Sequence, residues 1–260
     1  MDAVNRTLYI PLYGKAYVSR KGILLKDPKA EEIWEKEGFP LKRKSASKWL
    51  AYHMAMRAAV FDDWVKTRMD AHPDGAVVHI GCGMDSRILR VGQKAKVWFD
   101  LDFPEVIAER RKYYAESDAY KMLGFDATDL RWLEQVPGGT GIIIMEGVSM
   151  YLPPEALGQL VAAIGRHFER CYILMDCYSV FAAKASRIKN PINDVGVTQV
   201  YGLDDPQNLE GEVIRFIGER EMTPDRLIVQ LTGMEQTVFR KLYAGKTARK
   251  MYRLYQYEAG

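Results

Sequence analysis

The sequence predicts an α/β protein built on a doubly wound, mostly parallel sheet. Short apolar runs without strict alternation recur along the chain, at "VVHI" (77–80), "GIIIM" (141–145) and "CYILM" (171–175). Stretches with helical periodicity separate these runs, and the first run leads directly into Gly81-Cys82-Gly83. Such runs are typical of parallel strands covered on both faces, and a strand that runs into Gly-x-Gly is typical of nucleotide-binding sheets.

The first 75 residues predict a helical cap. Asp27 and Pro28 favour a helix start, because Asp accepts hydrogen bonds from the first N–H groups and Pro suits the first helical position. A longer amphipathic helix is expected over 45–70, and Arg57 falls on its apolar stripe, which consists of Leu50, Met54, Phe61, Val65 and Met69.

The remaining elements complete one domain. Strands are expected at 77–80, 95–102, 120–125, 141–146 and 171–176, with helices between them. Regular patterning is lost from about 178 to 210, a length that is typical of a functional loop such as a lid. We therefore predict a single domain over 1–260, divided into a helical cap (1–75), a cofactor-binding core (76–177), a lid insertion (178–210) and C-terminal strands and helices (211–260).

Composition argues against several classes of partner. The 37 Lys and Arg residues against 34 Asp and Glu residues leave a formal charge of +3, which is too small to favour nucleic acid or a membrane surface. No apolar stretch reaches the roughly 18 residues of a membrane span, and the first residues lack a secretory pattern. The three cysteines lack metal-ligand spacing. We expect a cytoplasmic protein with reduced thiols and no metal.

Carboxylates and glycines follow the expected strands at the points where they end. In an open α/β sheet these points meet at one edge, where ligands bind. The candidates are Gly81, Gly83, Asp100, Asp102, Asp129, Glu146 and Asp176. The glycines allow a ligand to approach the backbone, and Asp102 can accept both hydroxyls of a ribose, whereas Asp100 is expected to be structural.

Other candidates keep two interpretations each. Asp129 can face an adenine amino group or cap a helix, and Glu146 points into the cleft or needs a buried partner. Arg57 is either ion-paired or, with Lys15, the cation for a carboxylate-bearing cofactor.

The four histidines form no catalytic or metal pattern. His79 is expected to be a hydrogen-bonded core residue, and Cys82 is not expected to be a nucleophile. Where a dinucleotide fingerprint has its third glycine, Ser86 stands, which weakens a nicotinamide interpretation.

Four motifs in order resemble the leucine carboxyl methyltransferase family, and its bacterial polyketide-type O-methyltransferase branch most closely. They are "VVHIGCGMDSRILRV", "VWFDLDFPEVI", "DATDLRWL" and "IIIMEGVSMYLPPEAL", and the stretches "LYGKAYVSRKGILLKDPKAEEIW" and "MRAAVFDDWV" extend the likeness towards the N-terminus. The resemblance implies a class I, Rossmann-like methyltransferase fold that uses S-adenosyl-methionine.

The resemblance also implies roles for single residues. Lys15 and Arg57 are expected to hold the methionine carboxylate, Gly81 and Gly83 to line the cofactor, and Asp102 to bind the ribose. Asp129 and Leu130 are expected to frame the adenine, and Glu146 to contact its amino group or nearby atoms. Compared with the usual family pattern, Cys82 replaces Ala, Ser86 replaces Thr and Asp100 replaces Glu.

The function expected is methyl transfer to an oxygen of a small-molecule acceptor, a carboxylate of a polyketide-like or aromatic acid. A carboxylate is already ionised near pH 7 and needs no general base, so no catalytic residue is obligatory, although Glu146 is a candidate. In the lid, Lys184, Arg187 and Lys189 either attract an acid or are solvated, and apolar walls are expected from Tyr178, Phe181, Ile188 and Tyr201.

Three alternatives stay open at this point. The chain could methylate the carboxyl terminus of a protein, it could be a nicotinamide-dependent oxidoreductase, or it could bind a cofactor without turnover. The sequence leaves the acceptor and the oligomeric state open.

Overall fold

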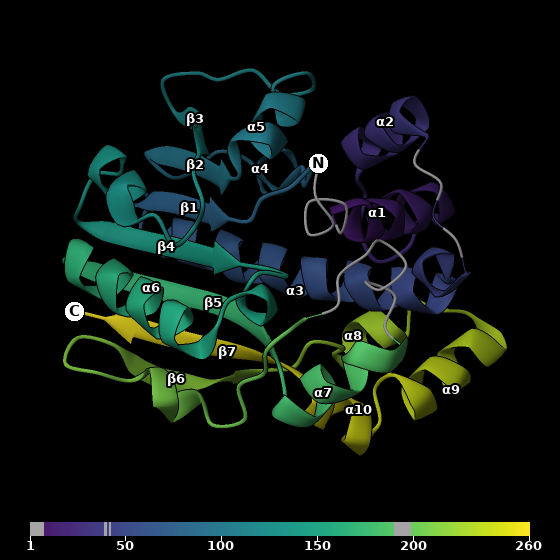
Figure 1. Cartoon of the computed structure of the whole chain (residues 1–260). Helices are drawn as coiled ribbons and strands as arrows, with labels where there is room; N and C mark the ends of the chain where they lie inside the picture. Colours follow the sequence, from purple (N-terminus) through teal and green to yellow (C-terminus); the bar gives the residue numbers. More distant parts are fainter. Residues whose placement is uncertain (1–7, 39–40, 42, 190–198) are drawn as a thin grey trace.

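The computed structural model describes residues 8–38, 41, 43–189 and 199–260, and of residues 43, 44 and 187–189 it describes the backbone alone. Its centre is a seven-stranded sheet in the order β3-β2-β1-β4-β5-β7-β6 (Figure 1). The strands are β1 (Ala76–Ile80), β2 (Val97–Asp102), β3 (Tyr120–Gly124), β4 (Thr140–Met145), β5 (Arg170–Tyr178), β6 (Arg215–Arg220) and β7 (Tyr252–Ala259). The first five are parallel, and β7 is antiparallel to both β5 and β6. The mostly parallel, doubly wound sheet is therefore confirmed.

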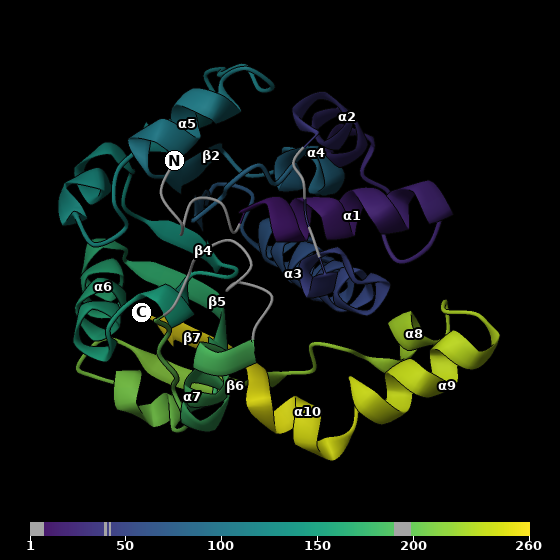
Figure 2. The same ribbon diagram turned by 45° about the vertical axis from the view of Figure 1, so that its right-hand side comes forward.

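Both faces of the sheet are covered, which explains the continuous apolar runs. Successive side chains of a strand point to opposite faces, so Val77 belongs to one core cluster and Val78 to the other. The first cluster packs on α3 (Lys48–Ala71) and the second on α6 (Pro154–His167). Figure 2 shows these two helices on opposite sides of the strands.

The N-terminal helices lie at the carboxyl edge of the sheet. They are α1 (Tyr9–Lys21), α2 (Pro28–Glu37), the short η2 (Arg43–Ala46) and α3. Asp27 caps α2 by accepting a hydrogen bond from the backbone of Ala30 at 2.9 Å, so the predicted helix start is confirmed. The arrowheads of β1 and β4 point towards α1 and α3 in Figure 1, which places the start of the chain over the ligand-binding edge.

The connections between the parallel strands are short. They contain α4 (Arg87–Val91), α5 (Pro104–Arg110), η3 (Leu130–Gln135) and η4 (Ser149–Tyr151). Pro occupies the start of α5 and α6, where its missing N–H costs no helical hydrogen bond.

The segment expected to be a lid contains more regular structure than the sequence predicted. Helix α7 (Val180–Lys189) follows β5 directly, and η6 (Pro206–Leu209) precedes β6. Backbone hydrogen bonds join Tyr201 N to Met150 O at 2.8 Å and Leu203 N to Tyr178 O at 2.7 Å. Residues 190–198 lie outside the described residues. The lid itself, like the division into cap, core and C-terminal part, stays a prediction.

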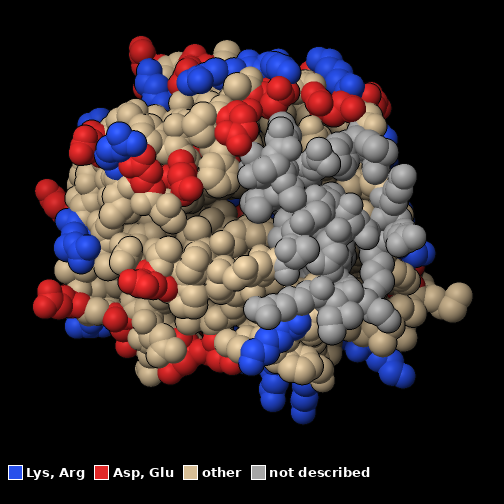
Figure 3. Space-filling view, viewed as in Figure 1, with Lys and Arg blue, Asp and Glu red and all other residues tan. Residues whose placement is uncertain are grey.

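The C-terminal part supplies three further helices and the strands β6 and β7. The helices are α8 (Asp225–Ile228), α9 (Gly233–Leu242) and α10 (Lys246–Met251). Charged side chains of both signs lie mainly around the periphery in Figure 3. Among the described helices, none combines the length and apolar character needed to cross a bilayer.

Candidate active site

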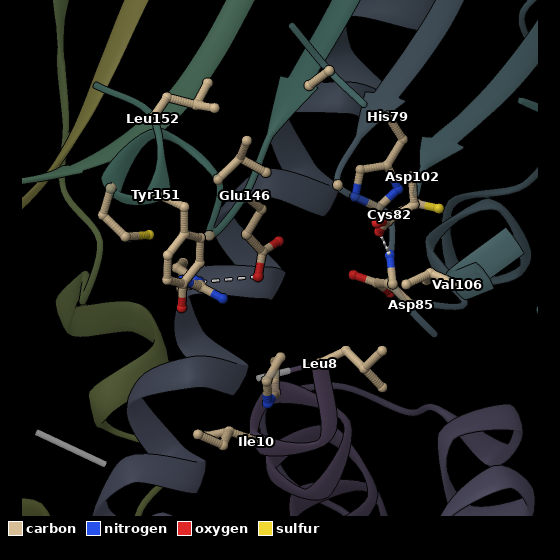
Figure 4. A pocket seen from close by; sticks show the side chains of 18 of the residues that line it. Leu8, Ile10, His79, Cys82, Asp85, Asp102, Val106, Glu146, Tyr151 and Leu152 are labelled. Atoms are coloured by element: carbon tan, nitrogen blue, oxygen red, sulfur yellow. Dashed lines mark hydrogen bonds and ion pairs between the residues drawn. The ribbon is translucent and has the colours of Figure 1, made fainter. Parts of the chain in front are cut away.

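A cavity of about 1170 Å³ opens at the carboxyl edge of the sheet. Residues of α1, α3 and the loops that follow β1, β2, β3 and β4 line it. Ligand pockets usually measure about 300–1,000 Å³, so this one has room for a nucleotide-sized cofactor and a second molecule. Figure 4 shows Asp85 and Asp102 on one side of the cavity and Glu146 and Tyr151 on the other.

The glycine loop after β1 forms one wall of this cavity. Gly81 and Gly83 both have positive φ, at 67° and 50°. A Cβ atom on Gly81 would lie 2.3 Å from Cγ2 of Val148, so a glycine is required there for the loop to meet the segment after β4. The two predicted glycines therefore lie at the ligand-binding edge.

Asp102 ends β2 next to this loop. Its Oδ2 accepts a hydrogen bond from Gly83 N at 2.7 Å, and its Oδ1 accepts one from Phe103 N at 2.8 Å. Burial raises the pKa of Asp102 to about 6, against the effect of these two hydrogen bonds. Asp102 is thus a fixed, strongly desolvated carboxylate beside the glycine loop, an environment that favours donors from a ligand.

Asp100 has a structural role, as predicted. Its side chain pairs with Arg110 and accepts hydrogen bonds from Trp98 Nε1 at 2.8 Å and Tyr120 Oη at 2.6 Å. Burial alone would raise its pKa, but Arg110 and the other donors hold the pKa of Asp100 at about 2. It does not line the cavity formed by the described residues.

The end of β3 differs from the expectation. Asp129 forms an ion pair with Arg131, with Nε and Oδ1 2.8 Å apart, and caps η3. Leu130 is 37% exposed, and neither residue belongs to the described lining. The residues that line the cavity here are Phe125, Asp126, Ala127 and Thr128, which lie closer to the strand end at Gly124.

Lys15 and Arg57 both line the cavity, and both are ion-paired. Lys15 Nζ lies 3.1 Å from Asp85 Oδ2. Arg57 donates from Nε to Glu146 at 3.0 Å and from a terminal nitrogen to Asp176 at 2.7 Å. All five side chains are buried. Arg57 was expected either to be ion-paired or to be a cation of the cofactor site. It is ion-paired, and it also lies in the cavity wall, so the two interpretations are compatible.

The sequence did not point to Arg87, which joins these groups. Its fully buried guanidinium pairs with Glu146 and donates to Asp62 Oδ1 at 2.7 Å. It also lies 3.2 Å from His79 Nε2, and the other ring nitrogen of His79 lies 3.4 Å from Asp100. The available signal was the pair of arginines, Arg87 and Arg90, in the short stretch "RILRV" that follows the glycine loop.

These arginines decide the charge of Glu146. Burial would raise its pKa, but Arg87 and Arg57 lower the pKa of Glu146 to about 2. Glu146 is therefore ionised at all ordinary pH values and too weak a base to take a proton from a hydroxyl group. Burial raises the pKa of the Cys82 thiol, which agrees with its expected inertness.

The outer part of the cavity is aromatic and apolar. Tyr178 packs edge-on against Tyr252 at 4.7 Å between ring centroids, and His53 stacks on the same Tyr252 at 5.9 Å. The remaining lining here includes Leu50, Met54, Met150, Tyr151, Leu152, Pro153 and Tyr243. A flat, largely apolar molecule fits such walls.

Only some of the residues expected to form apolar walls in the lid line the cavity. Tyr178 lines the cavity, whereas Phe181 is 69% exposed and Tyr201 is not among the described lining residues. Lys184 is exposed on α7. The side chains of Arg187, Ile188 and Lys189 lie outside the described residues.

This strand order, with its single antiparallel strand and its cavity beside a glycine loop and an acidic β2 end, defines a class I methyltransferase that uses S-adenosyl-methionine. The family model for leucine carboxyl methyltransferase matches residues 13–165, and the chain belongs to this family.

Curated relatives agree with the family. The chain is 27% identical to the tetracenomycin polyketide synthesis O-methyltransferase TcmP of Streptomyces glaucescens, over 99% of this chain and 97% of TcmP. It is 25% identical to the S-adenosyl-L-methionine-dependent methyltransferase dpfgK of Gibberella zeae, over 82% of this chain and 80% of dpfgK.

Solved structures support the fold. The plantazolicin methyltransferase BamL, in complex with a triazolic desmethylPZN analog and S-adenosyl-homocysteine (SAH), has a TM-score of 0.51 at 10% identity, covering 98% of this chain and 97% of BamL. Magnesium protoporphyrin IX methyltransferase of Synechocystis PCC 6803 with bound SAH has a TM-score of 0.50 at 12% identity, covering 88% of this chain and 94% of that one.

Proposed function

We propose that this S-adenosyl-methionine-dependent methyltransferase transfers the methyl group to an oxygen of a small molecule, the carboxylate of a polyketide-like or aromatic acid. The proposal is supported most by one observation: Glu146 and His53 have lowered pKa values, and Asp102 is held by two backbone N–H groups, so none of these three lining residues is suited to deprotonate a hydroxyl group.

The cavity residues fit the cofactor. Asp102 presents a carboxylate for the ribose hydroxyls beside Gly81 and Gly83, whose positive φ angles bring backbone close to the ligand. Lys15 lies at the same edge and is paired with Asp85, so it can exchange that partner for the methionine carboxylate. When bound, S-adenosyl-methionine supplies an electrophilic methyl group on a sulfonium sulfur.

Residues near the end of β3 would hold the adenine. Asp129 and Leu130 were expected to do so from the family resemblance. Their ion pairing and exposure favour Asp126 and Ala127 instead, because these two line the cavity.

The pKa values of the lining favour an acceptor that is already ionised. The pKa of Glu146 is about 2, and burial and Arg57 lower the pKa of His53 to about 4. Asp102, at about 6, already binds two backbone N–H groups at the proposed ribose position. A phenol, with a pKa of about 10, requires a stronger base than these groups provide. A carboxylate needs only alignment with the methyl group and exclusion of water.

The shape of the outer cavity supports an aromatic or polyketide-like acid. His53, Tyr178 and Tyr252 are in ring-to-ring contact at this wall, which suits a planar acceptor. The relative TcmP is named for polyketide O-methylation, and this supports the same class of acceptor here.

The test is a screen of aromatic acids, each paired with the phenol of the same ring system, for uptake of labelled methyl. We expect methyl esters as products, and a rate that changes little between about pH 7 and 9 because the acid is ionised throughout. Methylation of the phenols alone, with a rate that rises with pH, would overturn the carboxylate proposal. Methylation of peptide C-termini in preference to small acids would support the protein carboxyl methyltransferase alternative.

A further inference from the structure

His53 lies on α3 one helical turn before Arg57 and lines the outer part of the cavity. Its ring stacks on Tyr252 at 5.9 Å with an interplanar angle of 18°, and the Phe239 ring lies 6.5 Å away. These contacts fix the ring plane, and His53 and Tyr252 both belong to the cavity wall.

Neither ring nitrogen of His53 forms a hydrogen bond with any described residue, and the side chain is half-buried at the cavity wall. His79 differs in that it is only 2% exposed and its Nε2 lies 3.2 Å from Arg87. A ring nitrogen that lies in a cavity wall and has no partner among the described residues is available to a bound molecule.

The charge on this ring is set by its surroundings. Burial and the nearby guanidinium of Arg57 lower the pKa of His53 to about 4, so the ring is neutral at pH 7. A neutral imidazole offers one N–H donor and one acceptor nitrogen. It can therefore hold a carboxylate by a hydrogen bond, but it is not suited to remove a proton from a phenol.

The cations of the described lining are already engaged. Lys15 is paired with Asp85, and Arg57 is paired with Glu146 and Asp176. Lys15 is assigned to the methionine carboxylate in the proposed function, and an acceptor carboxylate that took Arg57 would break two buried ion pairs, which is costly. A neutral N–H beside an aromatic wall binds the acid without this rearrangement.

We propose that His53 is an acceptor-binding residue, which donates a hydrogen bond from its ring N–H to the carboxylate oxygen that is not methylated. This inference rests on the proposed function and specifies how the same site selects its acceptor. The bond leaves the second oxygen of the acid to attack the methyl group, and no proton moves between His53 and the acceptor.

A competing explanation comes from a second cavity of about 290 Å³, which His53, Tyr243 and Tyr252 also line. A water molecule there could serve the imidazole without any contact with the acceptor. The two explanations differ in their effect on acceptor binding, which a kinetic experiment measures.

The experiment compares His53→Phe, which removes the N–H, with His53→Gln and His53→Asn, which retain an N–H donor. His72→Asn is the matched control, because His72 stacks on Tyr172 at 4.9 Å and is not part of either described lining. For each protein, kcat and KM are measured with the best acid from the screen, and the dissociation constant of SAH is measured by calorimetry.

We expect His53→Phe to raise the acceptor KM by roughly 10- to 100-fold, the effect of losing one hydrogen bond to a charged group. The SAH dissociation constant should stay within about twofold, and His53→Gln or His53→Asn should recover part of the loss. An unchanged KM, an equal loss of SAH affinity, or no recovery with both amide variants would overturn the assignment. If the wild-type protein methylates no acid at all, the proposed function itself fails; if it does and the KM of His53→Phe is normal, only the role of His53 fails.

Discussion

The backbone N–H of Gly83 donates to Oδ2 of Asp102 at 2.7 Å, across 19 residues of sequence. This hydrogen bond joins the loop after β1 to the end of β2 and fixes the position of one relative to the other at the cavity wall. The second oxygen of Asp102 accepts from Phe103 N, which fixes the plane of the carboxylate. Four predictions test this site and the network behind it.

Replacing Asp102 should remove cofactor binding. Asp102→Ala deletes the carboxylate that would bind the ribose hydroxyls, and we expect the rise in melting temperature caused by SAH to be lost. Asp129→Asn is the control, because Asp129 pairs with Arg131 away from the described cavity lining and should leave the shift intact. Loss of the shift in Asp129→Asn, with retention in Asp102→Ala, would restore the adenine role first expected for Asp129 and refute the ribose role of Asp102.

Cofactor affinity should fall on acidification. The pKa of Asp102 is about 6 without ligand, and hydroxyl donors from the cofactor favour its ionised form. Binding therefore requires loss of a proton below pH 6, and the SAH affinity should drop about tenfold between pH 7.5 and pH 5. Titration calorimetry at both values measures the drop. An equally steep drop in Asp102→Asn would assign the effect to another group.

The raised pKa of Asp102 affects folding in the opposite direction: ionisation of Asp102 favours SAH binding but lowers the stability of the folded protein. Because burial raises the pKa of Asp102 above its unfolded value, its ionised form costs stability above about pH 6, and this cost fades as the pH falls towards 3.8. The melting temperature of ligand-free Asp102→Asn, measured relative to that of the wild type at each pH, should therefore rise between about pH 4 and pH 7.5, while SAH binding is weakened. A difference between the two proteins that stays constant over this range would contradict the desolvation of this carboxylate.

Removing Arg87 should strongly destabilise the fold. Arg87→Met removes one of the two guanidinium partners of each of the buried carboxylates Glu146 and Asp62, which keep Arg57 and Arg90, and we expect the free energy of unfolding to fall by about 3 kcal/mol. Urea denaturation monitored by circular dichroism measures the change. Arg131→Met, which removes an exposed ion pair, serves as the control and should leave the midpoint unchanged. Similar midpoints for the two variants would mean that the network around Arg87 adds little stability.

Much of the fold and part of the site were predictable because local patterns determine them. The continuous apolar runs predicted parallel strands, and Asp27 with Pro28 predicted the start of α2. The positions of Gly81, Gly83 and Asp102 followed from the sequence because each directly follows a strand or ends one, and strand ends converge at one edge.

The remainder depends on contacts between distant segments. Arg87 and Glu146 are 59 residues apart, and Arg57 and Asp176 are 119 apart, so no local pattern reveals their pairing. The register of the β3 loop was also uncertain, because Asp126 and Asp129 both follow the strand and only the three-dimensional path shows which one lines the cavity. His53 was missed because its neighbours Tyr252 and Phe239 come from the C-terminal part of the chain.

The position of β7 has a consequence for the order in which the protein assembles. This strand follows every other strand in the chain, yet it lies between β5 and β6, and its first residue, Tyr252, donates to Asp176 and accepts from Arg57. A chain that still lacks residues 252–259 has no strand between β5 and β6, and it lacks the Tyr252 ring on which His53 stacks. The complete sheet, and the part of the cavity wall that Tyr252 forms, can therefore assemble only after residues 252–259 have joined the chain.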